Sequence, residues 1–317
     1  MEIGPLADRV SLGRSDLRVR PLGVGTWAWG DRLVWRYGSG HSKVDVQGAW
    51  SASLDAGLDF FDTAEIYGRG TSESIVGEQM GRGGPPVVVA TKFFPYPWRV
   101  RRKSFRKALK GSLKRLGVST IDLYQIHFPK SHLPIESWVE ELGDAAAEGL
   151  VRAVGVSNYS LDQMRRAHDL LAHRGVPLAS NQVCYSLVNR DPEHNGVLAG
   201  CRELGITLIA YSPLGQGLLT GKYGPENPLP GMRRSGQAGR RLVDVQPLLA
   251  LMAEIGEAHG GKTQAQVALN WLLCQGTLPI PGAKNARQAL QNAGALGWKL
   301  EEGEVEALSE ASRPLRS

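Results

Sequence analysis

The sequence predicts a single (β/α)8 TIM barrel domain that spans residues 1–317, with an N-terminal β-hairpin and extra loops and helices. Two observations predict it. Short apolar runs alternate with amphipathic helical segments along most of the chain, and eight strand–helix pairs can be counted, which favours a closed barrel over an open sheet. The length also suits one barrel of about 250 residues with added loops.

The eight predicted strands share one composition. Each is brief, is rich in β-branched or aromatic residues, and is bounded by Gly, Pro or Asn. Their near-continuous apolarity is typical of strands that are covered on both faces, as in a parallel sheet. The predicted strands are residues 21–26, 58–64, 86–92, 121–128, 151–158, 178–185, 206–212 and 277–282.

The helical segments carry their own boundary signals. Residues 103–117 place leucines at helical spacing with Lys and Arg on the other face, and the segment ends in a glycine. Ser160 is expected to cap a helix that runs to Gly175, and another helix is expected over 263–276.

Two segments fall outside the strand–helix alternation. Residues 10–20 predict a β-hairpin that plugs the bottom of the barrel. Residues 215–241 form a long connection, rich in Gly and Pro, that contains four arginines and has no clear periodicity. A connection of that length inside a compact domain is usually functional or disordered.

Composition narrows the class of protein. The net charge of +6 is not accompanied by a helix-turn-helix, zinc-finger or RNA-recognition signature, so local basic clusters fit an anionic small ligand better than nucleic acid. Cys184, Cys201 and Cys274 are far apart, which argues against a disulfide scaffold or a metal site and for a reducing compartment. No secretory signal or apolar stretch of about 18 residues is present, so we expect a cytoplasmic protein without a membrane partner.

The ends of the predicted strands carry most of the polar residues that could do chemistry. Active sites of such barrels lie at the C-terminal ends of the strands and on the loops that follow. The strand-end residues are Asp62, Lys92, His127, Asn158, Gln182 and Ser212, and Tyr67 lies in the loop just beyond the first of them.

Four of these residues make chemical sense together as a site that reduces a carbonyl group. Tyr67 would donate the proton, and Lys92 would lower its pKa by favouring the phenolate. Asp62 would keep the lysine charged, and His127 would orient the carbonyl oxygen. Taken singly, each residue also fits a structural role, such as a helix cap, a loop aromatic, a solvated lysine or a hydrogen-bonded core histidine.

Eight segments resemble the aldo-keto reductase superfamily, and the resemblance runs over essentially the whole chain. They are GVGTWAWG, FFDTAEIYGRGTSESIVG, ATKF, LYQIHFP, AVGVSN, NQVCYS, AYSPLGQGLLTGKY and PIPGAKNARQALQNAG. The family's catalytic tetrad falls on Asp62, Tyr67, Lys92 and His127 without substitution. The ending with ALGW is similar to reductases of cyanobacterial and plastid type, some of which act on pyridoxal.

The resemblance implies an NADP(H) cofactor bound by the barrel itself, and no GxGxxG motif follows a strand. Asn158 and Gln182 match residues that hold the carboxamide, and Tyr211 matches the aromatic that stacks on nicotinamide. Lys284, beside the start of a helix, favours a 2′-phosphate, whereas Gln288 replaces an Arg that some branches carry. The full predicted cofactor set is Gly25, Thr26, Trp27, Asp62, Asn158, Gln182, Tyr211, Ser212, Leu214, Gly217, Lys222, Gly282, Lys284, Gln288 and Asn292.

Aromatic residues near the same strand ends suggest the substrate pocket. Trp27, Trp29, Trp98 and Phe128 are expected to line it, with Trp35 and Tyr37 as a rim, and the implied partner is a small carbonyl substrate. The 215–241 connection is expected to fold over the cofactor pyrophosphate. Two alternatives stay open: a regulatory module of the channel β-subunit type with little turnover, and a Schiff-base aldolase that uses Lys92.

Overall fold

The computed structural model describes residues 3–230 and 241–315. Eight parallel strands form one sheet in which each strand pairs with its neighbours in the sequence. The prediction of eight strands is confirmed at every position. Their bounds are β3 (Val24–Gly25), β4 (Phe60–Asp62), β5 (Val88–Phe93), β6 (Ile121–Ile126), β7 (Val151–Ser157), β8 (Leu178–Cys184), β9 (Thr207–Tyr211) and β10 (Leu278–Pro279).

Backbone hydrogen bonds close the sheet into a barrel. The Gly23 N–H donates to the Pro279 carbonyl and the Gly25 N–H to the Pro281 carbonyl, both at 3.0 Å. A parallel bridge between Gly25 and Gly282 continues this seam. The first and last strands are therefore joined, and the predicted barrel fold is confirmed.

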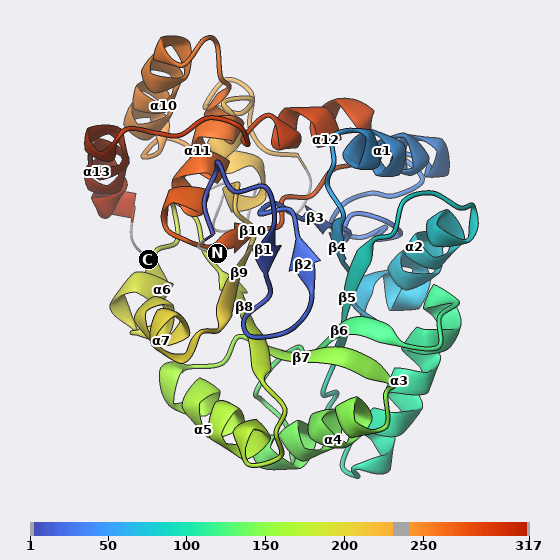
Figure 1. Ribbon diagram of the computed structural model, residues 1–317. Coiled ribbons are helices and arrows are strands. Elements are labelled where there is room, and N and C mark those ends of the chain that lie inside the picture. The colour runs from blue at the N-terminus through green and yellow to red at the C-terminus, as the bar shows by residue number, and fades with distance from the viewer. Residues whose placement is uncertain (1–2, 231–240, 316–317) are drawn as a thin grey trace.

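Helices form the outer layer, which Figure 1 shows as a ring around the strands. The helices of the described part of the chain are α1 (Lys43–Asp55), α2 (Thr71–Gly81), α3 (Lys103–Leu116), α4 (Ile135–Ala147), α5 (Leu161–Ala172), α6 (Asp191–His194), α7 (Val197–Leu204), α10 (Gln246–Ala258), α11 (Gln264–Cys274), α12 (Ala286–Ala293) and α13 (Glu302–Ala311), with short 3-10 turns η1 (Tyr67–Gly70), η2 (Gly215–Thr220) and η3 (Arg313–Leu315). None of these helices is long and apolar enough to cross a membrane.

The predicted starts of α5 and α11 are confirmed and their predicted ends lie too late in the sequence, whereas the predicted end of α3 at Gly117 is confirmed. Ser160 caps α5 and Thr263 caps α11, each in a capping box with a glutamine three residues later. The α5 helix stops at Ala172 and not at Gly175, because the backbone turns through His173 and reaches a left-handed glycine at φ 71°.

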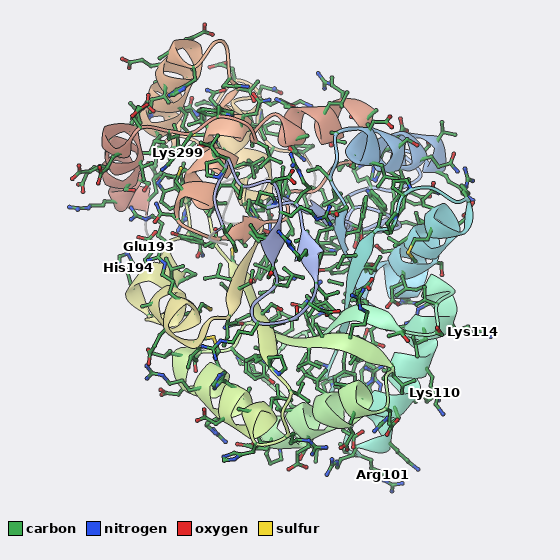
Figure 2. All side chains as sticks on the ribbon, in the orientation of Figure 1. Arg101, Lys110, Lys114, Glu193, His194 and Lys299 are labelled. Atoms are coloured by element: carbon green, nitrogen blue, oxygen red, sulfur yellow. The ribbon has the colours of Figure 1, made fainter. Side chains whose placement is uncertain are left out.

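Helix α3 shows why the alternation of apolar and basic residues predicts a surface helix. Phe105 and Leu109 are buried against the barrel, and the lysines of the opposite face are exposed. Figure 2 shows Lys110 and Lys114 projecting outward from this helix. Much of the positive charge therefore lies on the outer surface, away from the barrel interior.

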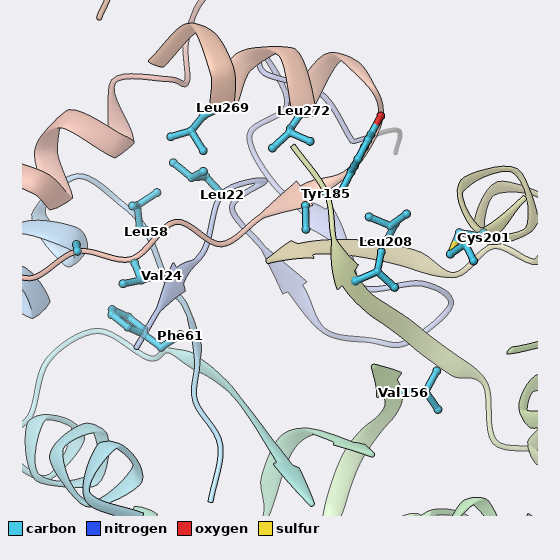
Figure 3. Close-up of a cluster of buried hydrophobic side chains, with 14 of the residues drawn as sticks. Leu22, Val24, Leu58, Phe61, Val156, Tyr185, Cys201, Leu208, Leu269 and Leu272 are labelled. Carbon is cyan, nitrogen blue, oxygen red and sulfur yellow. The ribbon is translucent and has the colours of Figure 1, made fainter. Parts of the chain in front are cut away.

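A continuous apolar layer joins the strands to the surrounding helices. Figure 3 shows part of it, with Leu269 and Leu272 of α11 pointing toward the strands and Val24 and Phe61 on the strands themselves. These side chains are buried. Their removal from water fixes the strands in place and so fixes the directions of the strand ends.

The N-terminal hairpin closes one end of the barrel, as predicted. Strands β1 (Val10–Ser11) and β2 (Arg18–Val19) pair in antiparallel fashion, and Figure 1 shows them lying across the barrel. Val10, Leu12, Leu17 and Val19 are buried in one cluster with inward-facing strand residues such as Leu123. The opposite end of the barrel, where the strands finish, is left for the site.

Candidate active site

A cavity of about 890 Å³ lies at the C-terminal ends of the strands. The sequence-predicted residues Asp62, Tyr67, His127, Asn158, Gln182 and Ser212 line it. Lys92 does not line the cavity, because its side chain is completely buried behind Asp62. The structure thus brings the predicted strand-end residues of six different strands to one place.

Asp62 and Lys92 form a buried ion pair. The Lys92 Nζ donates to Asp62 Oδ1 at 2.5 Å and to the Thr63 carbonyl at 2.7 Å. The Gln182 Nε2 donates to the other Asp62 oxygen at 2.8 Å. Burial lowers the pKa of Lys92, and the charge of Asp62 opposes that shift. The carboxylate therefore favours the charged form of the ammonium.

Tyr67 lies against this pair at the start of η1. Its ring centroid is 5.1 Å from the Lys92 Nζ, and the Trp27 ring stacks on it at 6.0 Å. Burial, together with the charge of Asp62, raises the pKa of Tyr67 well above its usual value. The net direction of the pKa shift is therefore opposite to the lowering that was expected from Lys92. The Asp62 carboxylate already offsets the ammonium charge, and desolvation of the phenol dominates.

His127 is the third side chain around Tyr67. The two rings are perpendicular, with centroids 5.9 Å apart. Burial, with a smaller contribution from the charge of Lys92, lowers the pKa of His127 well below its usual value, so the imidazole is neutral at pH 7. Its Nδ1 atom is buried without a hydrogen-bond partner in residues 3–230 and 241–315. A neutral imidazole can donate one hydrogen bond without competing for the proton of Tyr67.

Strained backbone positions follow two of the strands. Asn158 and Ser212 have φ values of 61° and 51°, in the left-handed region that residues other than glycine rarely adopt. The Asn158 amide donates to the His127 carbonyl at 3.0 Å, and the Tyr211 hydroxyl donates to the Asn158 Oδ1 at 2.9 Å. These bonds help hold the strand ends of β6, β7 and β9 together around the cavity.

The far end of the cavity lies at the start of α12. Lys284, Arg287 and Gln288 line it, and Asn285 caps the helix by accepting a hydrogen bond from the Gln288 N–H. The Lys284 Nζ donates to the Trp35 carbonyl at 3.4 Å and lies 4.8 Å from the Trp35 ring centroid. Two cationic side chains and a helix N-terminus make this end suited to an anionic group.

All of the residues predicted to bind the cofactor line this one cavity, which connects the Tyr67 end to the α12 end. The 215–241 connection, which is the predicted lid over the pyrophosphate, contributes Gly217 and Lys222, and Leu214 directly precedes it. Residues 231–240, which contain three of the four arginines of the predicted lid, lie outside the described residues. The cavity therefore joins the side chains around Tyr67 to a cationic end, which suits a molecule with a phosphate at one end.

The predicted substrate-pocket residues divide into two groups. Trp27, Phe128 and the predicted rim residue Trp35 line the cavity. Trp29 does not, because it is fully buried in the outer layer, where its Nε1 donates to the Ala283 carbonyl at 2.7 Å. Trp98 does not line it either, because its side chain is 72% exposed and stacks on Tyr96 at 4.5 Å.

Sequence reasoning overlooked Phe94, which lines the cavity and meets the His127 ring edge-on at 5.4 Å. The signal was available, since Phe94 follows the end of β5 directly and lies two residues beyond Lys92. Among the described residues, no cluster of three or more His, Cys, Asp or Glu side chains could hold a metal ion.

An eight-stranded α/β barrel with a cavity and titratable side chains at its strand ends is typical of enzymes, and comparison with known proteins gives its family. The family model described as "Aldo/keto reductase family" matches residues 21–313. The chain is 44% identical over 312 residues to a chloroplastic pyridoxal reductase of Arabidopsis thaliana, with 94% of this chain and 84% of the relative covered. It therefore belongs to the aldo/keto reductase family and is an oxidoreductase.

Solved structures agree with this assignment. The glycerol dehydrogenase of Gluconobacter oxydans superposes with a TM-score of 0.82 at 28% identity, covering 96% of this chain and 94% of that one. An aldo-keto reductase from Klebsiella pneumoniae in complex with NADPH superposes with a TM-score of 0.76 at 28% identity, covering 96% and 95%.

Proposed function

We propose that this oxidoreductase reduces aldehydes or ketones to alcohols with NADPH, and that Tyr67 is the general acid. One observation carries the proposal. The Tyr67 phenol lies between the buried Asp62–Lys92 pair and the neutral imidazole of His127, at the end of a cavity that also reaches the cationic start of α12. This arrangement suits a substrate oxygen at one end and a cofactor phosphate at the other.

The residues around the cavity fit NADPH. Asn158 and Gln182 would hold the carboxamide, and Tyr211 would lie against the nicotinamide ring. Lys284, with Arg287 beside it, would hold the 2′-phosphate at the α12 terminus, where free N–H groups favour an anion. When bound, the cofactor supplies the hydride for the carbonyl carbon. The Klebsiella relative crystallised with NADPH supports this choice.

The protein supplies the proton. A phenol is protonated at neutral pH, and burial raises the pKa of Tyr67 further, so Tyr67 keeps its proton until negative charge develops on the substrate oxygen. The phenol O–H bond then breaks as the new O–H bond of the alcohol forms, and the Lys92 ammonium stabilises the phenolate that remains. His127 orients the carbonyl by donating a hydrogen bond to its oxygen, and solvent returns a proton to Tyr67.

Flat aldehydes are the substrates that the cavity walls favour. Trp27, Phe94 and Phe128 contribute aromatic faces and edges close to Tyr67 and His127. Stacking against such walls stabilises an aromatic ring more than an aliphatic chain of the same size. We include pyridoxal in this class because the Arabidopsis relative is a pyridoxal reductase.

Steady-state oxidation of NADPH by the purified protein tests this function. We expect continuous turnover with pyridoxal and with aromatic aldehydes, and slower turnover with short aliphatic ones. A single slow turnover with tight NADPH binding would instead support a regulatory module. Trapping of a substrate on Lys92 by borohydride would support the aldolase alternative, although the ion pair of Lys92 with Asp62 disfavours a neutral amine nucleophile.

A further inference from the structure

The inward-facing positions of four adjacent strands form two rows. Phe60, Ala90, Leu123 and Ala153 belong to the apolar cluster beneath the site. Side chains alternate along a strand, so the residue two positions further on faces inward again. In β4 to β7, this second row consists of Asp62, Lys92, Gln125 and Gly155.

Gln125 is the member of this row with a polar side chain to which no role has yet been given. Its side chain is completely buried, and in the strand register it lies between Lys92 of β5 and Gly155 of β7. The Gln125 Nε2 donates to Asp62 Oδ2 at 3.4 Å, the same oxygen that accepts from Gln182 at 2.8 Å. Two glutamine amides from different strands therefore share one oxygen of the carboxylate, while Lys92 takes the other.

The other end of the Gln125 amide is held as well. The Ser180 hydroxyl of β8 donates to Gln125 Oε1 at 3.3 Å, across the position of Gly155. A methyl group at Gly155 would lie 2.3 Å from the Ser180 oxygen and 2.9 Å from the Gln125 Cγ. Glycine is therefore required at this position for the amide and the hydroxyl to meet.

A buried amide costs free energy unless its polar atoms are bonded, and an apolar side chain would fill the same space without that cost. The two partners that Gln125 finds are the carboxylate of the proposed active site and a serine that holds the amide. We propose that Gln125 is a positioning residue that fixes the Asp62 carboxylate against Lys92, with Ser180 and Gly155 setting its orientation. This inference rests on the proposed carbonyl reduction.

The expected action is indirect, through the charge of Lys92. The Asp62 carboxylate and the Lys92 ammonium interact best when Oδ1 points at Nζ. Hydrogen bonds donated to Oδ2 keep the carboxylate in that orientation. The charged and titratable groups that face Lys92 are Asp62 from β4, Glu73 from α2, Tyr67 from η1 and His127 from the end of β6. Without the Gln125 amide, Asp62 holds the ammonium less well, and Lys92 loses its proton at a lower pH.

The test compares Gln125→Met with Gln79→Met. Gln79 is a buried glutamine in α2 whose amide nitrogen has no hydrogen-bond partner in the described chain, so its replacement controls for the general effect of a buried Gln-to-Met change. For Gln125→Met we expect kcat for an aromatic aldehyde to fall about three- to tenfold. The alkaline limb of the kcat profile should move to lower pH, while the Kd of NADPH stays within about twofold. For Gln79→Met we expect no change in any of these.

Ser180→Ala is the second variant, because it leaves Gln125 in place and only frees its orientation. It should shift the alkaline limb in the same direction by a smaller amount, and it should add nothing in the Gln125→Met background. Additive effects, or an unchanged alkaline limb in both variants, would overturn the inference. If the wild-type protein did not reduce aldehydes, the proposed function itself would be refuted, so the two failures are distinguishable.

Discussion

Replacing Lys92 by methionine removes one partner of the buried ion pair and leaves the other in place. The Asp62 carboxylate would then be buried without a cation, because Lys92 is the group that donates to its Oδ1. Breaking a buried pair in this way costs about 3–5 kcal/mol of unfolding free energy. Gln182 still donates to Oδ2 at 2.8 Å, which places the expected loss at the lower end, about 3 kcal/mol.

Equilibrium unfolding in urea measures this loss, with Asp62→Asn/Lys92→Met as the companion variant. The double variant carries no buried charge at either position, so it should recover at least half of the stability lost by the single variant. The single variant should also reduce aldehydes at least about a hundredfold more slowly. A single variant as stable as the wild type, or a double variant that is less stable still, would refute the view that the two charges depend on each other.

Three further predictions concern the histidine, the cofactor phosphate and the substrate. Below pH 6.5, His127 takes up a proton in the unfolded protein but not in the folded protein, where its pKa is lowered. The free energy of unfolding of the wild type, relative to that of His127→Asn, should therefore fall as the pH falls, by up to about 1.4 kcal/mol per pH unit. Urea unfolding at pH 7 and pH 5.5 measures this difference. Lys284→Met should raise the KM of NADPH about tenfold and leave that of NADH within about twofold, and an equal rise for both would contradict the phosphate assignment. Phe128→Ala should raise the KM of pyridoxal about tenfold. The control Trp98→Ala changes an exposed ring outside the cavity and should leave this KM within about twofold. A larger rise in KM for Trp98→Ala than for Phe128→Ala would show that the substrate binds elsewhere.

The barrel could be predicted from sequence because each strand is buried on both faces. The run from Val151 to Ser157, for example, carries one exposed residue, Arg152, and is otherwise buried. Such runs have a length and composition that helices of this protein do not share. Once the strands are predicted, their C-terminal ends are known, and these ends place Asp62, Lys92 and His127 at the same end of the barrel. The cytoplasmic location and the single-domain organisation stay predictions.

Side-chain direction beyond the strand ends could not be predicted in the same way. Trp29 and Trp98 both follow strands closely, yet one turns into the outer layer to reach the Ala283 carbonyl and the other turns out to solvent. Loop backbones set these directions, and their conformations depend on tertiary contacts. The pKa of Tyr67 was also out of reach, since it depends on the balance between burial and an ion pair whose geometry only the fold provides.

Gln125 shows a third limit of prediction from the sequence. It lies one position before the last residue of β6, inside a run that reads as an ordinary buried strand. Its partners Asp62 and Ser180 are distant in sequence and become neighbours only through the strand register. The available signal was the glutamine itself, a polar residue at an inward-facing position in an otherwise apolar barrel strand.

Comparison of wild type and Tyr67→Phe in stopped-flow oxidation of NADPH by an aromatic aldehyde tests the central claim most directly. The phenylalanine keeps the ring that packs against Trp27 and His127 and removes the hydroxyl group that carries the proton. The account predicts a rate lower by at least about a hundredfold, with the Kd of NADPH unchanged within a few-fold. Reduction at the wild-type rate by Tyr67→Phe would contradict it.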